Sequence, residues 1–321
     1  MPRIKYQDFN LSAPSLETIA QANAICAEYQ EQGYDLTLRQ LYYVFVSRNL
    51  IPNKMREYDR LGRLVSQARL AGLMDWNYIV DRTRSLKSIS HWATPASVVD
   101  SAAYSYRRDK WVGQPYRVEV WVEKEALAGV VGKAADAEDV PYFSCRGYGS
   151  VSEMWVAGQR LKGYARNGQT PLIIHLGDHD PSGIDMTRDI DDRLTMFMGG
   201  VEVKRIALNM DQVERYNPPP NPAKESDSRW GGYVQEYGYE SWELDALEPR
   251  VLDNLIRRTI RDYRDDSLYN ALAKQEAEER AYLEMVSRNW ESIVEDYITP
   301  TYGAPEIEVE DEELEEEDED E

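Results

Sequence analysis

The sequence predicts an α/β protein, with a helical N-terminal region followed by a mainly parallel, Rossmann-like sheet and further helices. Between residues 116 and 208 short apolar runs alternate with stretches of helical periodicity, a pattern typical of parallel βαβ units. Residues 248–298 again favour helices. We therefore expect one domain over residues 1–112 and a second over 113–303. The acidic tail, residues 304–321, is too charged to fold and is expected to be disordered.

Three helices are expected in the N-terminal region. The first covers residues 14–32 and the third covers residues 55–72. The second, residues 38–48, begins at a capping box in which Thr37 is the N-cap and Gln40 occupies the third helical position. Several short helices followed by an extended stretch suit a winged-helix DNA-binding domain.

Two tyrosines on the second helix are expected to have different surroundings. Tyr42 lies four residues after Leu38 on an apolar stripe and is expected in the core. Tyr43 lies four residues after Arg39 on another stripe, so we expect it to be exposed beside a cation. A tyrosyl nucleophile needs access to a phosphate and a nearby positive charge that favours the phenolate. The alternative is a packing role, because the chain holds 22 tyrosines.

Charge is unevenly placed along the chain. The net charge is −21, but residues 306–321 alone hold 13 acidic residues and no basic one. Residues 39–87, which include Arg82 and Arg84, hold 10 basic residues against 4 acidic ones. This basic segment is suited to track a phosphate backbone; the alternative is a solvated helical surface. The tail is then either a DNA mimic for the basic segment or only a solubilising segment.

Composition argues against several classes of protein. The two cysteines, Cys26 and Cys145, form neither a disulfide framework nor a CxxC zinc pattern, which indicates a reducing cytoplasm. The N-terminus has no hydrophobic signal core, and no apolar run reaches membrane-spanning length. We therefore expect a cytoplasmic protein with no membrane partner.

The expected sheet region can be followed along the chain. Strands are expected at residues 116–123, 142–144, 172–174 and 201–208, with helices at 124–138, up to about 165, and 183–197. Residues 217–232 are rich in proline and are expected to form a long loop without a regular element.

Three carboxylates follow strand ends in this region. Glu123 closes the first strand, and Asp178 and Asp180 follow the run 172–174. Ligands bind at the carboxyl ends of the strands in open α/β sheets, so these side chains are expected to converge. Like charges that lie close together need a positive partner, and a hard divalent cation such as Mg²⁺ is the usual one. Two solvated aspartates in a polar turn are the alternative for the Asp pair alone.

Basic and histidine side chains nearby are weaker candidates. Arg146 precedes a helix N-terminus, where phosphate binding is favourable, although a plain turn fits equally well. Lys224 and Arg229 lie in the expected long loop and are candidate DNA contacts. His175 and His179 flank the Asp pair, where packing is favoured over a phosphate contact.

The motifs VEVWVEKEAL, RGYGSVSE and IIHLGDHDPSGIDM, in that order, resemble a Toprim domain, the metal-binding module of topoisomerases, primases and some nucleases. The Asp-x-Asp-Pro-x-Gly form with Gly-Tyr upstream is most similar to the topoisomerase VI A subunit and its meiotic double-strand-break relatives. The stretch RQLYY, residues 39–43, matches the Arg-x-x-Tyr-Tyr of the winged-helix domain that precedes Toprim in that family. The stretch WELDAL, residues 242–247, resembles the family's late Glu-Leu-x-Ala-Leu. The likeness covers roughly residues 35–250.

The resemblance implies a site and a reaction. Glu123, Asp178 and Asp180 would hold Mg²⁺, at one or two sites, and Tyr43 would attack the backbone of double-stranded DNA with Arg39 beside it. Glu123 is also a candidate general acid or base. The family pattern implies a homodimer, in which the tyrosine of one protomer works with the metal of the other, associated with the nucleoid. Topoisomerase activity would need a separate ATPase subunit, because the chain carries no Gly-rich ATPase motif.

Two other functions remain open at this point. In a hydrolytic Toprim nuclease, water replaces Tyr43 as the nucleophile. A non-catalytic DNA-binding protein would keep the fold without the reaction, although the three carboxylates argue against that.

Overall fold

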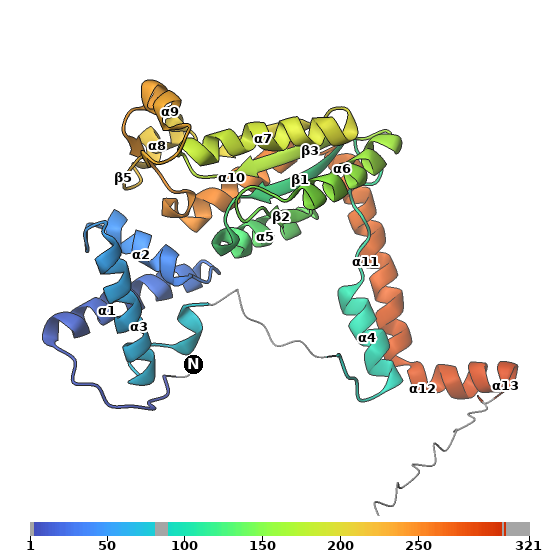
Figure 1. Ribbon diagram of the computed structural model, residues 1–321. Coiled ribbons are helices and arrows are strands. Elements are labelled where there is room, and N and C mark those ends of the chain that lie inside the picture. Colours follow the sequence, from blue (N-terminus) through green and yellow to red (C-terminus); the bar gives the residue numbers. More distant parts are fainter. Residues whose placement is uncertain (1–2, 81–88, 304, 306–321) are drawn as a thin grey trace, which may run out of the picture. The chain divides into compact units, whose positions relative to one another are not determined.

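The computed structural model describes residues 3–80, 89–303 and 305 (Figure 1). The expected acidic tail and the candidate DNA contacts Arg82 and Arg84 lie outside these residues. The chain divides into two compact units. One contains Met1–Leu86 and Asp109–Asn270, and the other contains Lys87–Arg108 and Ala271–Glu321.

The larger unit begins with the three expected helices, α1 (Ala13–Glu31), α2 (Leu38–Ser47) and α3 (Met55–Leu70), followed by the 3₁₀ helix η1 (Trp76–Tyr78). The capping box of α2 is confirmed. The Thr37 amide donates to Oε1 of Gln40 at 2.8 Å, and the Gln40 amide donates to Oγ1 of Thr37 at 3.3 Å. The three helices share one apolar core. A wing after α3 stays a prediction, because the chain after Val80 leaves the described residues.

A four-stranded parallel sheet follows, in the order β2-β1-β3-β4. The strands are β1 (Tyr116–Val122), β2 (Tyr142–Ser144), β3 (Thr170–Leu176) and β4 (Glu202–Ala207). The expectation of an α/β protein with parallel strands is therefore confirmed. The central strands β1 and β3 run side by side over their full length, from Tyr116 opposite Thr170 to Val122 opposite Leu176.

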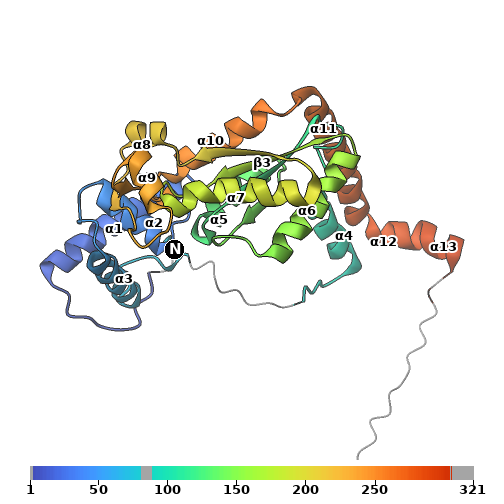
Figure 2. The ribbon, with the colours of Figure 1, turned by 45° about the horizontal axis from the view of Figure 1, so that its top comes forward.

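Helices cover both faces of the sheet (Figure 2). On one face α6 (Val151–Arg166) and α7 (Pro181–Met198) lie side by side over Trp121 and Ile173. On the other face η2 (Glu125–Leu127), α5 (Ala128–Ala137) and α10 (Pro249–Asp262) cover the opposite side chains of the same strands, among them Val118, Val120 and Val122. The expected alternation along β1 is confirmed.

A smaller layer of elements follows β4. It consists of α8 (Met210–Tyr216), β5 (Asn221–Pro222), α9 (Trp230–Tyr237), β6 (Glu240–Ser241) and η3 (Leu244–Ala246). The expectation that residues 217–232 form no regular element was wrong, because β5 pairs with β6 and α9 already begins at Trp230. The partner strand lies 20 residues further along the chain, so a local pattern could not show the pairing.

The second unit is helical. It contains α4 (Pro95–Ser105), most of α11 (Asp266–Arg288), α12 (Trp290–Ile293), the π-helix η4 (Val294–Ile298) and α13 (Thr299–Tyr302). Arg108 forms an ion pair with Glu279 at 2.7 Å, and Ser287 Oγ donates to the Ala96 carbonyl at 3.0 Å. None of the helices within the described residues is long and apolar enough to cross a membrane.

Candidate active site

The carboxylates that follow β1 and β3 meet at one end of the sheet. Glu123 is the residue after β1 and Asp178 the second residue after β3. The Asp178 amide donates to Oε2 of Glu123 at 2.8 Å. Two acidic residues 55 positions apart in the sequence are therefore neighbours, and the expected convergence of these two strand ends is confirmed.

Two glycines make this close approach feasible. A Cβ on Gly177 would lie 2.9 Å from Oε2 of Glu123, and a Cβ on Gly183 would lie 2.3 Å from the Asp178 carbonyl oxygen. Side chains at either position would push the loop off the carboxylates. Glycine is needed here for close packing rather than for an unusual backbone angle.

Asp180 is held by the start of α7. It is the N-cap residue, and its Oδ1 accepts from the Gly183 amide at 2.6 Å and from Oγ of Ser182 at 2.9 Å. Its Oδ2 accepts no hydrogen bond from the described residues. Burial, and then the nearby carboxylate of Asp180, raise the pKa of Glu123. Glu123 and Asp180 therefore repel each other unless a cation comes between them.

Asp178 is buried, with only 6% of its surface exposed. Its Oδ1 accepts from the Leu244 amide at 2.8 Å, and its Oδ2 receives Nζ of Lys124 at 2.7 Å. Burial raises the pKa of Asp178 to about 7 against the opposing effect of Lys124. Both oxygens of this carboxylate already have partners within the chain.

An ion-pair network links these carboxylates to α2. Lys124 Nζ also lies 2.6 Å from Oε2 of Glu243 and 3.2 Å from Oδ1 of Asp245. On the other side, Arg39 pairs with Glu243 and, through Nε at 2.7 Å, with Oδ2 of Asp245. Burial alone would raise the pKa of Glu243, but Lys124 and Arg39 outweigh burial and hold it at about 2.

Sequence reasoning did not identify Lys124 as part of the site, nor assign a role to Glu243 and Asp245. A signal for Lys124 was present: it follows Glu123 directly, at a strand end where the acidic residues need a positive partner. Glu243 and Asp245 lie on the chain far from β1, so only the fold shows that they reach it.

Tyr43 is buried rather than exposed, with 6% of its surface accessible, so the expected exposure was wrong. Nearly every side of α2 is covered, by α1, α3 and η3, so both stripes of the helix face protein. The Arg39 guanidinium carbon lies 5.7 Å from the Tyr43 ring centre, which confirms the expected neighbour. Burial and then Glu243 raise the pKa of Tyr43 well above its usual range, although Arg39 opposes the shift.

Tyr43 nevertheless borders open space. A pocket of about 160 Å³ is lined by Tyr42, Tyr43, Tyr58, Lys54 and Glu243 among others. Tyr42 packs in the core as expected, and its hydroxyl donates to Oδ1 of Asn53 at 2.9 Å. Three tyrosine side chains thus line the same hollow as an acidic and a basic side chain.

Arg205 on β4 organises the loop that carries the aspartates. Its guanidinium donates to backbone carbonyls at 2.6 to 3.1 Å, those of Gly177, Asp178, Gly183 and Leu208. The side chain is partly buried, and burial lowers the pKa of Arg205 to about 10. It therefore adds a positive charge beside the carboxylates while fixing the backbone around them. Nothing in the sequence pattern of β4 indicates this role.

Replacing Arg205 with Met should destabilise the protein by about 3 kcal/mol or more, because several buried carbonyls lose their donor. Urea unfolding followed by circular dichroism would measure the loss. Arg188→Met is the control, since Arg188 lies on α7 with its side chain largely in solvent. Equal midpoints for the two variants would show that the carbonyl cluster does not depend on Arg205.

Both histidines of the motif are buried, which supports packing roles. Nδ1 of His175 lies 2.8 Å from Oγ1 of Thr187, and Nδ1 of His179 lies 2.9 Å from the Tyr233 hydroxyl. Burial lowers the pKa of His175 to about 3 and that of His179 to about 4. The two imidazoles are therefore neutral and add no charge to the site.

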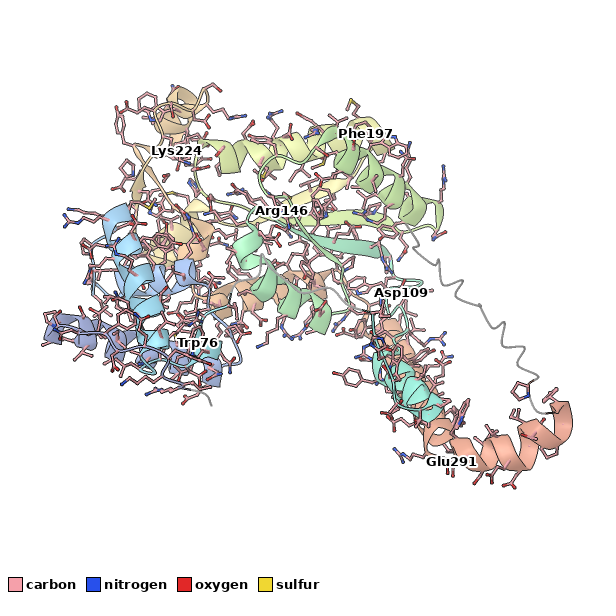
Figure 3. All side chains as sticks on the ribbon, turned by 60° about the horizontal axis from the view of Figure 1, so that its bottom comes forward. Trp76, Asp109, Arg146, Phe197, Lys224 and Glu291 are labelled. Atoms are coloured by element: carbon pink, nitrogen blue, oxygen red, sulfur yellow. The ribbon has the colours of Figure 1, made fainter. Side chains whose placement is uncertain are left out.

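Two of the remaining candidate DNA contacts, Arg146 and Lys224, lie apart from each other (Figure 3). Arg146, ahead of α6, is exposed and pairs with Glu125 at 3.1 Å. Arg229 pairs with Asp185 at 2.8 Å, and Lys224 is exposed after β5. The structure does not bring these three side chains into one cluster with the carboxylates, and their role in DNA binding stays a prediction.

The residues present fit a magnesium ion. Among the described residues no three acidic, histidine or cysteine side chains form a ready cage. Magnesium keeps several waters, however, and is usually held by one or two carboxylates together with substrate phosphates. Oε1 of Glu123 and Oδ2 of Asp180 are hard oxygen donors that receive no hydrogen bond from the described part of the chain. This donor set suits Mg²⁺ rather than zinc or copper.

Comparisons with known proteins add no relative: no protein-family model, no curated protein and no solved structure matches this chain.

Proposed function

We propose that this protein is a Mg²⁺-dependent DNA-cleaving enzyme of the kind its motifs resemble, the topoisomerase VI A subunit. The observation that carries the proposal is the meeting of Glu123 with the Asp178–Asp180 loop at the carboxyl end of two adjacent parallel strands. Acidic residues placed together at this position, where open α/β sheets bind ligands, are typical of a phosphoryl-transfer site.

The resemblance supplies the proposed division of work between the residues. Glu123, Asp178 and Asp180 would hold the cation, which would neutralise charge that develops on the scissile phosphate and position it. Tyr43 attacks phosphorus through its hydroxyl oxygen, which loses its proton. The new bond joins the tyrosine to the 5′-phosphate, and the bond to the 3′-oxygen breaks, so that the 3′-oxygen takes up a proton.

A hydrolytic nuclease is the second candidate, and one observation favours it. Tyr43 is buried, and its surroundings raise its pKa, which disfavours the phenolate that a transesterase needs. In this alternative water attacks the phosphate and Tyr43 only packs. Both candidates need the same carboxylates and the same cation.

A Glu123→Gln variant tests the metal-dependent reaction. Glutamine keeps an oxygen that accepts from the Asp178 amide, so the loop is retained and only the charge is lost. Nicking of supercoiled plasmid should require Mg²⁺, stop with EDTA and fall at least roughly tenfold in this variant. Glu125→Gln is the control, because Glu125 pairs with the exposed Arg146. Mg²⁺-independent cutting, or equal rates in both variants, would rule the proposal out.

The substrate, the oligomeric state, the location and the partner are part of the same proposal. We propose double-stranded DNA as the substrate, a homodimer, association with the nucleoid, and a separate ATPase subunit for any topoisomerase activity. Each of these depends on the resemblance in sequence.

A further inference from the structure

The pocket of about 160 Å³ beside α2 has an aromatic wall. The rings of Tyr43, Tyr42 and Tyr58 follow one another in edge-to-face contact, with ring centres 5.2 and 5.4 Å apart. Met55 adds an apolar thioether and is 72% exposed, so the pocket reaches the surface of the protein. Tyrosine and methionine side chains are surfaces against which another flat ring packs well.

Two polar side chains of the pocket have hydrogen-bond donors to spare. Asn53 is fully engaged, because its Nδ2 donates to the Pro220 carbonyl at 3.1 Å and to Oδ1 of Asn221 at 2.8 Å, and its Oδ1 accepts from Tyr42. In the described part of the chain, Nδ2 of Asn221 and the ammonium group of Lys54 have no hydrogen-bond or ion-pair partner. Both groups are donors only, so a ligand of this pocket should carry acceptors.

The volume of the pocket suits a single ring system. Pockets for drug-sized ligands measure about 300–1,000 Å³, so this one admits a smaller group. A nucleobase is flat and carries carbonyl oxygens or ring nitrogens that accept hydrogen bonds. Proteins bind unpaired bases by stacking them on aromatic side chains and by hydrogen bonds to their edges. A base inside a duplex is stacked and paired, so it reaches such a pocket only after it leaves the helix.

We propose that this pocket binds one unpaired nucleobase of a DNA strand. The inference rests on the proposed function, because that function makes DNA the ligand, and it narrows the substrate to DNA in which a base lies outside the helix. Tyr43 lines the same pocket. The nucleotide that is held there would therefore adjoin the phosphate that Tyr43 attacks.

Short DNA duplexes that differ in one nucleotide test this inference. The first carries a single bulged thymidine, the second carries an abasic nucleotide at the same position, and the third is fully paired. Fluorescence anisotropy in EDTA measures their binding to the full-length protein without cleavage. The wild-type protein should bind the thymidine bulge roughly tenfold more tightly than the abasic bulge, because the two duplexes differ only in the base.

A change in the aromatic wall should remove this preference. Tyr58→Leu takes away one ring and should bind the two bulges alike, with the abasic bulge bound as by the wild-type protein. Tyr78→Leu is the matched control, since Tyr78 is also a partly buried tyrosine on the same apolar core but does not line the pocket. If Tyr58→Leu does not fold, Met55→Ala replaces it, because Met55 is largely in solvent. In that variant the preference should fall about threefold.

The outcomes separate this inference from the proposed function. Equal binding of the two bulges by the wild-type protein would overturn the base pocket but leave Mg²⁺-dependent nicking of plasmid standing. A preference that persists unchanged in the folded pocket variant would also overturn it, because the base would then bind elsewhere. Binding to none of the three duplexes would overturn both the pocket and DNA as the substrate. A preference for the thymidine bulge in a protein that does not nick plasmid would support the pocket and contradict the proposed function alone.

Discussion

Replacing Tyr43 with Phe is expected to abolish the covalent DNA adduct and to lower cleavage on the order of 10⁴-fold or more, because only the attacking oxygen is removed. The aromatic ring stays, so the edge-to-face packing against Tyr42, with ring centres 5.2 Å apart, is retained. Labelled DNA that remains on the protein through a denaturing gel measures the adduct.

Tyr42→Phe is the matched control. It removes a neighbouring hydroxyl that donates to Asn53, which should cost about 1 kcal/mol of stability but leave the adduct intact. An equal amount of adduct from the Tyr43→Phe variant would show that Tyr43 is not the nucleophile. Cleavage by all three proteins without any adduct would identify water as the attacking group.

The rate of cleavage by Tyr43 should also depend on pH. Burial and the Glu243 carboxylate raise the pKa of Tyr43, so the phenol stays protonated near neutral pH. If the phenolate attacks, the rate should rise about tenfold per pH unit as long as the pH lies below that pKa. A rate that levels off near neutral pH would argue against tyrosine attack.

Replacing Asp180 with Asn is expected to lower cleavage by at least roughly 100-fold and to weaken divalent-cation binding in parallel, because a charged oxygen ligand becomes neutral. Stability should change little. Asparagine is as good an N-cap as aspartate, so the amide oxygen can still accept from Gly183 and Ser182 at the start of α7.

Asp192→Asn on the same helix is the control, since Asp192 is exposed and pairs with the exposed Arg188. Plasmid nicking and Mn²⁺ calorimetry on both variants, together with a thermal melt, separate chemistry from folding. A large drop in melting temperature for Asp180→Asn would mean that the capping role, not the charge, accounts for the loss. Unchanged cation binding would exclude Asp180 as a ligand.

The meeting of the two acidic strand ends was largely predictable from the sequence. Glu123 and Asp178 each follow an apolar run, and the rule that parallel strands end at one edge was sufficient to bring them together. The Thr37–Gln40 capping box was predictable for the same reason, because its partners lie within one turn.

The surroundings of Tyr43 were not predictable in this way. The stripes of α2 indicate which residues share a face, but not that η3, about 200 residues later, covers the face carrying Arg39. Ion pairs such as Arg39 with Asp245 and Lys124 with Glu243 join distant parts of the chain, and no local periodicity reports them. Helix α4 was not predicted, although Thr94 and Ser97 form a capping box at its start.

The position of Asp180 at the start of α7 has a consequence for how the site forms. The hydrogen bonds to Oδ1 of Asp180 that begin the helix also fix the direction of its Oδ2. The helix and the orientation of this carboxylate therefore form in the same folding event. The proposed cation site would then require little rearrangement on binding, because the helix already orders this carboxylate. Amide hydrogen exchange at Gly183 and Ile184 should therefore be slow in the apo protein and change little when Mg²⁺ is added.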